Sequence, residues 1–123
     1  MNLNKVAIID DDVSFCRALS RLLRTRDFEA VEYHSAEAFF SDLSKSHFCC
    51  LLLDIQLGGM SGLEMHRRLL ASGDCTPVVF MTAHDDSALR ARTLQNSAEV
   101  FYKMDPSAKI IDAMRQAGCA AGG

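Results

Sequence analysis

Apolar and polar positions divide the chain into two kinds of segment. Five short apolar runs have the length and the β-branched or aromatic content of buried strands: residues 6–9, 29–33, 49–53, 78–81 and 100–102. The stretches between and after them repeat apolar residues every three or four positions, as amphipathic helices do. Helices are therefore expected over residues 13–24, after Ser35, from Ser61, over residues 87–95 and from Asp105.

Capping residues support several of these helix starts. Asp12 precedes the first helix, whose apolar face carries Phe15 and Leu19. The segment Ser61-Gly-Leu-Glu64 has the form of a capping box, in which each side chain satisfies the other residue's free backbone donor. Asp105 followed by Pro106 predicts the start of the last helix.

The order of the segments predicts an α/β fold. Strand and helix alternate along the whole chain with short connections, a pattern typical of a parallel sheet with helices on both faces. A length of 123 residues fits one domain, 1–123. With 49% hydrophobic and 24% charged residues, the chain is too apolar to be disordered.

Charge and hydropathy argue against two classes of partner. The net charge is −3 and the pI is about 5.7, so we expect no basic surface and no direct nucleic acid binding. No apolar stretch approaches the length needed to cross a membrane, and the first residues lack the pattern of a signal peptide. We therefore expect a cytoplasmic protein that makes no membrane contact.

The cysteines do not form a recognisable motif. They are odd in number, include no C-x-x-C pair and lie mostly in apolar segments: Cys16, Cys49, Cys50, Cys75 and Cys119. The histidines show no ligand spacing with them. We therefore expect reduced, buried thiols rather than a disulfide or a zinc site.

Polar side chains follow four of the five predicted strands. They are Asp10, Asp11 and Asp12 after the first strand, Asp54 after the third, Thr82 after the fourth and Lys103 after the fifth. In an open parallel sheet, ligands bind beyond the carboxyl ends of the strands, and in the flavodoxin-like order this place lies between the first and third strands. We expect the functional site there.

The converging carboxylates predict a cation. They would repel one another and resist desolvation unless something positive lay among them. Because the ligands are all oxygen atoms, Mg²⁺ is favoured over zinc. An aspartate beside such an ion can attack a phosphoryl group to form an acyl phosphate, with a hydroxyl and an ammonium on the other oxygens.

Taken singly, each of these residues has an ordinary explanation. An aspartate at a strand end is usually a turn or helix cap, and Asp12 fits that role. Thr82 alone would be a strand-end residue and Lys103 alone a solvated charge. The interpretation depends on finding acid pair, acid, hydroxyl and lysine on successive strand ends of one sheet.

The motifs resemble those of response-regulator receiver domains. They are Ile8-Ile-Asp-Asp-Asp12, Leu52-Leu-Asp-Ile55, Met60-Ser-Gly62, Val79-Phe-Met-Thr-Ala83 and Lys103, and they span nearly the whole chain. The sequence around Asp54 and Thr82 is similar to that of regulators with a DNA-binding helix-turn-helix output. The resemblance implies a flavodoxin-like, doubly wound five-stranded sheet of order 2-1-3-4-5 with five helices.

The resemblance also implies a function in phosphorelay signalling. Asp54 would accept a phosphoryl group from a sensor histidine kinase or a phosphotransfer protein, and Thr82 and Lys103 would bind its oxygens. Mg²⁺ would be held by Asp10, Asp11, Asp54 and the backbone carbonyl of Gln56. Phosphorylation would switch the surface of the fourth helix and fifth strand toward an effector domain, a downstream protein or a homodimer. Such a domain is no enzyme beyond its own phosphorylation and dephosphorylation.

Three positions depart from the family's usual pattern. Gly58 stands where proline is usual in the loop after the phosphoacceptor. Met104 stands where the family has a proline after a cis bond, so the bond after Lys103 is expected to be either trans or unusually strained. Val100 stands where an aromatic residue usually turns inward on activation.

Three other functions compete with that of a phosphoacceptor. A flavodoxin-like FMN binder needs a Ser/Thr/Gly-rich loop after the first strand, where an Asp triplet would repel the flavin phosphate. An aspartyl-phosphate hydrolase would usually carry a second Asp two residues after its nucleophile, where this chain has Gln56. The serious rival is a non-catalytic, receiver-like docking module, suggested by Gly58, Met104 and Val100.

Overall fold

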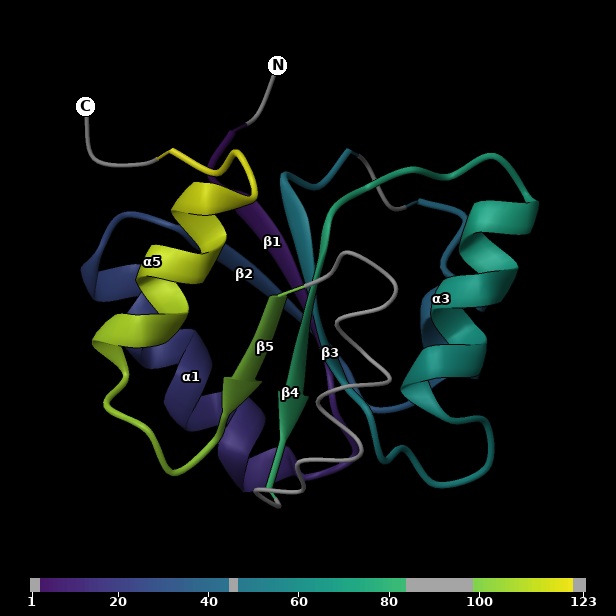
Figure 1. Ribbon diagram of the computed structural model, residues 1–123, viewed down its shortest axis with the longest axis horizontal. Coiled ribbons are helices and arrows are strands. Elements are labelled where there is room, and N and C mark those ends of the chain that lie inside the picture. Colours follow the sequence, from purple (N-terminus) through teal and green to yellow (C-terminus); the bar gives the residue numbers. More distant parts are fainter. Residues whose placement is uncertain (1–2, 45–46, 84–98, 121–123) are drawn as a thin grey trace.

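The computed structural model describes residues 3–44, 47–83 and 99–120 (Figure 1). A five-stranded parallel sheet forms its centre, with the order β2-β1-β3-β4-β5. The strands are β1 (Lys5–Ile9), β2 (Glu29–Tyr33), β3 (Cys50–Asp54), β4 (Val78–Thr82) and β5 (Glu99–Tyr102). The predicted fold class and strand order are confirmed.

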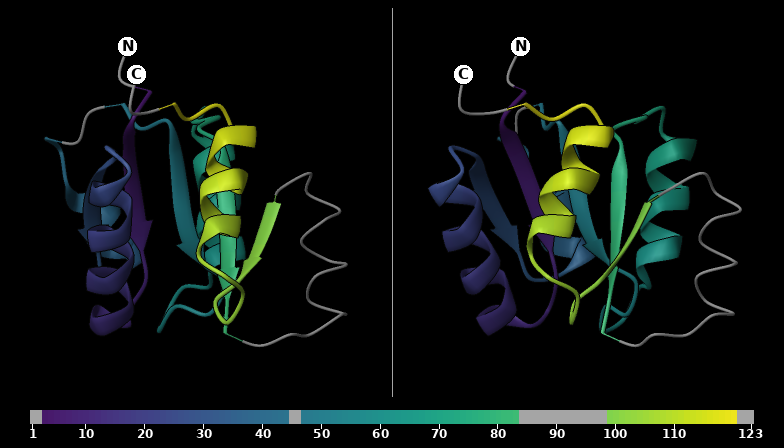
Figure 2. Two further views of the ribbon diagram at one scale, coloured as in Figure 1. Left: turned by 90° about the vertical axis from the view of Figure 1, so that its left-hand side faces the viewer. Right: turned by 60° about the vertical axis from the view of Figure 1, so that its left-hand side comes forward.

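Helices cover both faces of the sheet. The described residues include α1 (Val13–Thr25), α2 (Ala36–Ser41), α3 (Gly62–Ala71) and α5 (Ala108–Gln116). Helices α1 and α5 lie on one face, while α3 lies on the other (Figures 1 and 2). Helix α2 shares the second face, because its Phe39 belongs to the same core cluster as Met65 of α3. The helix predicted over residues 87–95 lies outside the described residues.

Three of the helix starts are capped as their sequences suggest. The Asp12 carboxylate accepts the backbone N–H of Phe15 at 3.0 Å, and Ser35 Oγ accepts that of Ala38 at 3.0 Å. Ser61 Oγ accepts the N–H of Glu64 at 3.1 Å, the expected first half of the capping box. The Glu64 carboxylate itself lies 3.5 Å from an Arg67 nitrogen.

The last helix begins later than predicted. Asp105 and Pro106 do not start α5, because the N-cap position falls on Ser107, which makes no side-chain capping bond. The reason is a tight turn, in which the Lys109 N–H bonds to the Pro106 carbonyl at 2.9 Å before the regular helical pattern is set up. The Asp105 carboxylate lies 3.8 Å from the Lys109 ammonium instead.

The core is divided by the sheet into two layers. Alternate residues of β1 point to opposite faces, so Val6 and Ile8 pack under α1 and α5, while Ala7 and Ile9 pack under α2 and α3. Both faces are covered, which explains why the central strands read as continuous apolar runs. On β5, Phe101 joins the first layer and Val100 the second, as an unbroken strand requires.

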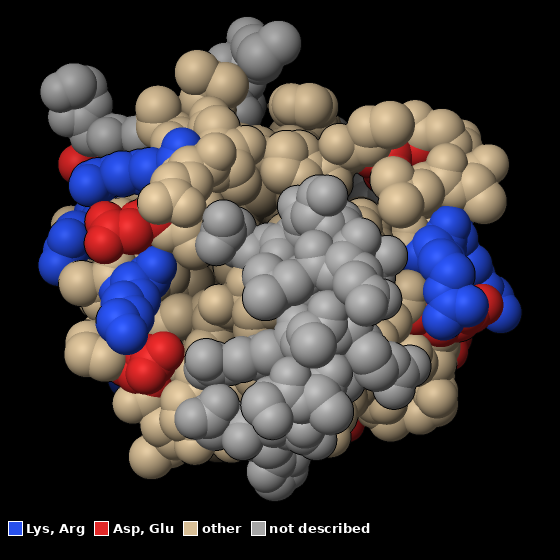
Figure 3. Space-filling model, viewed as in Figure 1, with Lys and Arg blue, Asp and Glu red and all other residues tan. Residues whose placement is uncertain are grey.

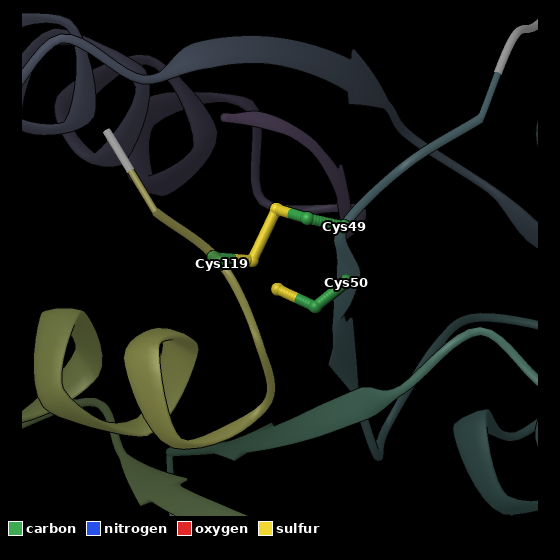
Figure 4. A group of neighbouring side chains, drawn as sticks. All are labelled: Cys49, Cys50 and Cys119. Atoms are coloured by element: carbon green, nitrogen blue, oxygen red, sulfur yellow. A yellow bond between two sulfur atoms is a disulfide. The ribbon is translucent and has the colours of Figure 1, made fainter. Parts of the chain in front are cut away.

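The cysteines contradict the expectation of reduced thiols. Cys49 and Cys119 form a disulfide, with Cα atoms 5.2 Å apart and a sequence separation of 70 (Figure 4). Both residues are buried, and Cys50 lies beside them. No local pattern indicated this pair, because residues so far apart meet only when α5 has packed onto the sheet. Cys16, Cys50 and Cys75 are free, as expected, but Cys75 is exposed rather than buried.

Charged side chains on the described surface are mixed in sign. On the face shown in Figure 3, basic and acidic side chains lie next to one another at the α5 side and over α3. None of the described helices combines the length and the apolar character that a membrane span requires.

Candidate functional site

The predicted site residues converge at the carboxyl ends of the strands. Asp10 follows β1, Asp54 ends β3, Thr82 ends β4 and Lys103 follows β5. The strands are parallel, so these ends share one edge of the sheet, the lower edge in Figure 1. Asp10, Asp54 and Thr82 are buried there, at 0%, 5% and 1% exposure, while Asp11 is exposed.

The three candidate metal-binding carboxylates form one group. One oxygen from each of Asp10, Asp11 and Asp54 lies within 4.8 Å of the others. Asp10 Oδ2 is buried and, within the part of the chain that the structure describes, faces no donor other than the Lys103 ammonium. A buried carboxylate oxygen without a hydrogen bond is costly unless a positive charge compensates it. The group therefore needs cationic partners.

Lys103 supplies one of these positive charges. Its Nζ lies 2.5 Å from Asp10 Oδ2 and 3.3 Å from Asp54 Oδ2. The side chain is only 11% exposed, and the two carboxylates raise the pKa of Lys103 despite the opposing effect of burial. One ammonium facing three carboxylates leaves the site electrostatically negative.

The carboxylate of Asp54 is held between a backbone donor and the lysine. Its Oδ1 accepts the N–H of Gln56 at 3.0 Å, and Oδ2 faces Lys103. Burial raises the pKa of Asp54 to about 6, and nearby Asp10 adds to the rise, while the Gln56 N–H and Lys103 oppose it. An aspartate in this setting stays ionised at neutral pH, and a further cation stabilises its charged form.

The loops around the site are fixed by Asp11 and Gly62. Asp11 Oδ2 accepts the N–H of Gly58 at 3.2 Å, which joins the loop after β1 to the loop after β3. Gly62, at the start of α3, lies so close to β3 that an added Cβ would be 2.2 Å from the Asp54 carbonyl oxygen. No side chain fits there, which explains the glycine after Ser61.

The comparison with known families shows which kind of domain this chain forms. The model of the response regulator receiver domain matches residues 6–114, which are most of the chain. The chain belongs to the response regulator receiver family. Receiver domains are signalling modules of two-component systems, and the resemblance drawn from the motifs is thereby confirmed.

Several relatives of this receiver domain are whole regulators. The response regulator protein TodT of Pseudomonas putida is 31% identical over 113 residues, which are 91% of this chain and 50% of TodT. The transcriptional regulatory protein FixJ of Bradyrhizobium diazoefficiens is 30% identical, over 94% of this chain and 59% of FixJ. The receiver domain thus spans about half the length of these relatives.

Solved structures show the same fold. A response regulator receiver protein from Burkholderia phymatum is 35% identical, with a TM-score of 0.81 over 97% of this chain and 98% of that one. The response regulator StyR is 34% identical, with a TM-score of 0.81 over 93% of this chain and 58% of that one.

The residue that sequence reasoning missed at this site is Phe15. It was predicted only as part of the apolar face of α1, yet its ring centroid lies 4.4 Å from Lys103 Nζ. A ring face at this distance attracts a cation. The signal available in the sequence was an aromatic residue one helical turn after Asp11, but nothing there indicated that Lys103 would lie over it.

The chemistry of the donors fits a hard divalent cation. The group around Asp10 offers oxygen atoms alone, and the Asp10 carboxylate is fully buried. Carboxylates of this kind suit Mg²⁺ better than zinc. Receiver domains generally bind Mg²⁺ at their acidic pocket, so the residues present fit the ion of the family.

A second group, which has mixed ligand types, fits a metal less well than the acidic group does. Ligand atoms of Cys16, Glu32 and His34 lie within 4.8 Å of one another, although sequence spacing gave no hint of it. The Cys16 thiol donates to the Asp10 carbonyl at 3.3 Å, and burial raises its pKa to about 12. The thiol is therefore protonated and already has a partner, and we assign it a packing role.

Proposed function

We propose that this receiver domain accepts a phosphoryl group on Asp54 in a Mg²⁺-dependent reaction. The donor is a sensor histidine kinase or a phosphotransfer protein. The observation that carries the proposal is the gathering of the Asp10, Asp11 and Asp54 carboxylates within 4.8 Å, with the Lys103 ammonium on two of them. A docking surface has no need of buried, mutually repelling charges.

In the reaction, an Asp54 oxygen forms a bond to phosphorus as the bond between phosphorus and the donor's histidine nitrogen breaks. The electron pair of the broken bond returns to the donor imidazole, and an acyl phosphate remains on Asp54. The Gln56 N–H bond to Asp54 Oδ1, at 3.0 Å, fixes the orientation of the carboxylate before attack. The nucleophile is thus positioned in advance.

The remaining site residues stabilise the charge of the transferred group. Asp10, Asp11, Asp54 and the Gln56 backbone carbonyl would hold Mg²⁺, which would supply electrostatic stabilisation of the phosphoryl oxygens. Thr82, at the end of β4, donates its hydroxyl to one phosphoryl oxygen. Lys103 moves from Asp54 Oδ2, which lies 3.3 Å away, to another phosphoryl oxygen.

The proposed output surface consists of β5 and the helix expected over residues 87–95. Val100 is short and β-branched, so it cannot act as an aromatic switch. Phe101 is buried on the opposite layer of the core and stays there. We expect the helix segment, which lies outside the described residues, to shift as a body toward an effector domain, a downstream protein or a second copy in a phosphorylation-dependent homodimer.

The domain works in the cytoplasm, where kinases of this class deliver phosphoryl groups. Residues 1–123 act as a single receiver domain, and any contact with DNA belongs to an output segment of the kind implied by similarity to transcriptional regulators such as FixJ. The domain itself catalyses nothing beyond its own phosphorylation and dephosphorylation.

A titration with beryllofluoride tests the proposal against a non-catalytic docking module. Beryllofluoride mimics the phosphoryl group on a carboxylate and requires the same cation. We expect saturable, Mg²⁺-dependent amide shifts at Asp54 and Thr82 in the wild type and none in Asp54→Asn. A wild type that binds neither Mg²⁺ nor beryllofluoride would favour the docking module.

A further inference from the structure

The disulfide lies at the edge of the sheet opposite to the acidic site. Cys49 immediately precedes β3, whereas Asp54 ends that strand. Cys119 follows α5, so the bond joins the end of the last helix to the start of the central strand, near the two termini in Figure 1. The proposed phosphorylation does not use this link.

Both ends of the link are held in place by bonds that do not involve sulfur. The Cys49 N–H donates to the Lys5 carbonyl at 2.8 Å, beside β1. The Cys119 N–H donates to the Met114 carbonyl at 3.0 Å, and Gly118 ends the helix with φ +108°. The backbone therefore brings the two sulfurs together, and the thiols would still face each other after reduction.

The chain beyond the link runs back to the amino-terminal segment. The Ala120 N–H donates to the Leu3 carbonyl at 2.8 Å. A single backbone hydrogen bond outside the regular helices and strands opens easily unless something restrains the segment. A covalent bond one residue earlier, at Cys119, is such a restraint.

We infer that Cys49 and Cys119 form an oxidation-controlled site that fastens the segment after α5 to the amino edge of the sheet. In the oxidised state the bond holds residues 117–120 against β1 and β3. In the reduced state the domain keeps its fold, because small buried thiols pack as apolar side chains, but the segment opens more often. The site gives the domain a thiol-dependent state independent of Asp54.

The oxidation is a two-electron exchange with a low-molecular-weight disulfide such as glutathione disulfide. When the reduced segment after α5 opens and brings Cys119 to solvent, its thiolate attacks a sulfur of the reagent, releases one glutathione thiolate and forms a mixed disulfide. The second cysteine thiolate attacks the protein sulfur of that intermediate and releases the second glutathione. The two cysteines lose two electrons and two protons in total, and the reagent gains them as two thiols.

The neighbouring thiol of Cys50 does not take part in the exchange. Its sulfur lies within 4.8 Å of both bonded sulfurs, and Figure 4 shows it beside the link. The residue is fully buried, and burial raises the pKa of its thiol to about 12. Because only the thiolate attacks a disulfide, Cys50 stays a packing residue and the bond keeps one pairing.

The test uses the whole chain in reduced and oxidised glutathione buffers at neutral pH. Alkylation and peptide mapping count the free thiols, and amide hydrogen exchange of Ala120 reports the freedom of the segment. We expect oxidation to remove the Cys49 and Cys119 thiols alone, to be reversed by reduced glutathione, and to slow Ala120 exchange by about tenfold. Cys50→Ser and Cys75→Ser should behave like the wild type, and Cys119→Ser should stay in the fast-exchanging state.

Three results would overturn the inference. The first is that all thiols remain alkylatable in the oxidising buffer, and the second is that the bond forms while Ala120 exchanges equally fast in both states. The third is that the reduced protein retains zinc on Cys49, Cys50 and Cys119, which would make the cluster a metal site. An Asp54→Asn background keeps these outcomes separate from phosphorylation.

Discussion

Lys103 lies over the ring of Phe15, with Nζ 4.4 Å from the ring centroid. The described residues contain no cis peptide bond, so the bond from Lys103 to Met104 is trans. The ammonium is instead placed by Asp10 on one side and by the aromatic face on the other. The ring of Phe15 thus helps to position Lys103, in place of the proline that usually follows this lysine in the family.

Phe15→Leu should therefore slow phosphorylation while leaving the fold intact. A cation over an aromatic ring is stabilised by about 0.5–1 kcal/mol, so we expect phosphorylation by acetyl phosphate to slow by about twofold to fivefold. Phe40→Leu on α2, far from Lys103, is the matched control. Equal rates for both variants, at unchanged thermal stability, would show that Phe15 only fills space.

Asp11→Ala should separate metal binding from stability. We expect Mg²⁺ affinity to fall by at least about tenfold, since one carboxylate of the group is lost. Without metal, the variant should be more stable than the wild type by about 0.5–1 kcal/mol, because repulsion among the carboxylates is relieved.

The neighbouring residue provides the control for that experiment. Asp12 caps α1 through its bond to the Phe15 N–H. Asp12→Ala should cost about 1 kcal/mol of stability and leave Mg²⁺ affinity nearly unchanged. Isothermal titration and chemical denaturation measure both quantities, and unchanged Mg²⁺ affinity in Asp11→Ala would remove Asp11 from the ligand set.

The raised pKa of Asp54 predicts how metal-free stability depends on pH. The pKa rises from 3.8 to about 6 on folding, mainly through burial. The folded state then favours the protonated carboxyl. The stability that Asp54 contributes is therefore fully present below about pH 4 and is lost as the pH rises through about 6. In a chelating buffer, Asp54→Asn should be increasingly more stable than the wild type over this range, by about 1–3 kcal/mol at neutral pH. A difference that does not change with pH would contradict the assignment of the shift to Asp54.

Gly62→Ala should disturb Asp54 through the backbone. The added Cβ would lie 2.2 Å from the Asp54 carbonyl oxygen, so α3 or β3 must move. We expect a loss of about 3 kcal/mol in unfolding free energy and slower phosphorylation. At Gly73, φ is +88° but no atom lies within 4 Å of an added Cβ. Gly73→Ala should therefore cost only about 1 kcal/mol of unfolding free energy and leave phosphorylation unchanged. Equal effects of the two variants would exclude the close approach as the cause.

Much of this architecture could be predicted from sequence because it depends on local patterns. The apolar runs at β1 and β3 and the cap at Asp12 are encoded within a few residues, and the parallel order places Asp10, Asp54, Thr82 and Lys103 on one edge. Convergence of these residues follows from topology, so it did not need atomic detail.

The features that escaped prediction depend on residues far apart in the chain. The Cys49–Cys119 link arises only when α5 packs onto the sheet, and Phe15 meets Lys103 only when α1 packs beside the end of β5. The start of α5 was misplaced for a local reason, because Pro106 and Ser107 form a tight turn that sequence preferences do not distinguish from a first helical turn. Pairings of this kind require the folded geometry.

The most direct test of phosphoacceptance on Asp54 is mass-spectrometric mapping after incubation with acetyl phosphate and Mg²⁺. We expect one phosphoryl group per chain, located on the peptide that contains Asp54. The label should be absent from a chelated sample and from Asp54→Asn, with the fold of the variant confirmed by amide spectra. A label that persists in Asp54→Asn, or that maps to another residue of the wild type, would contradict the proposed function.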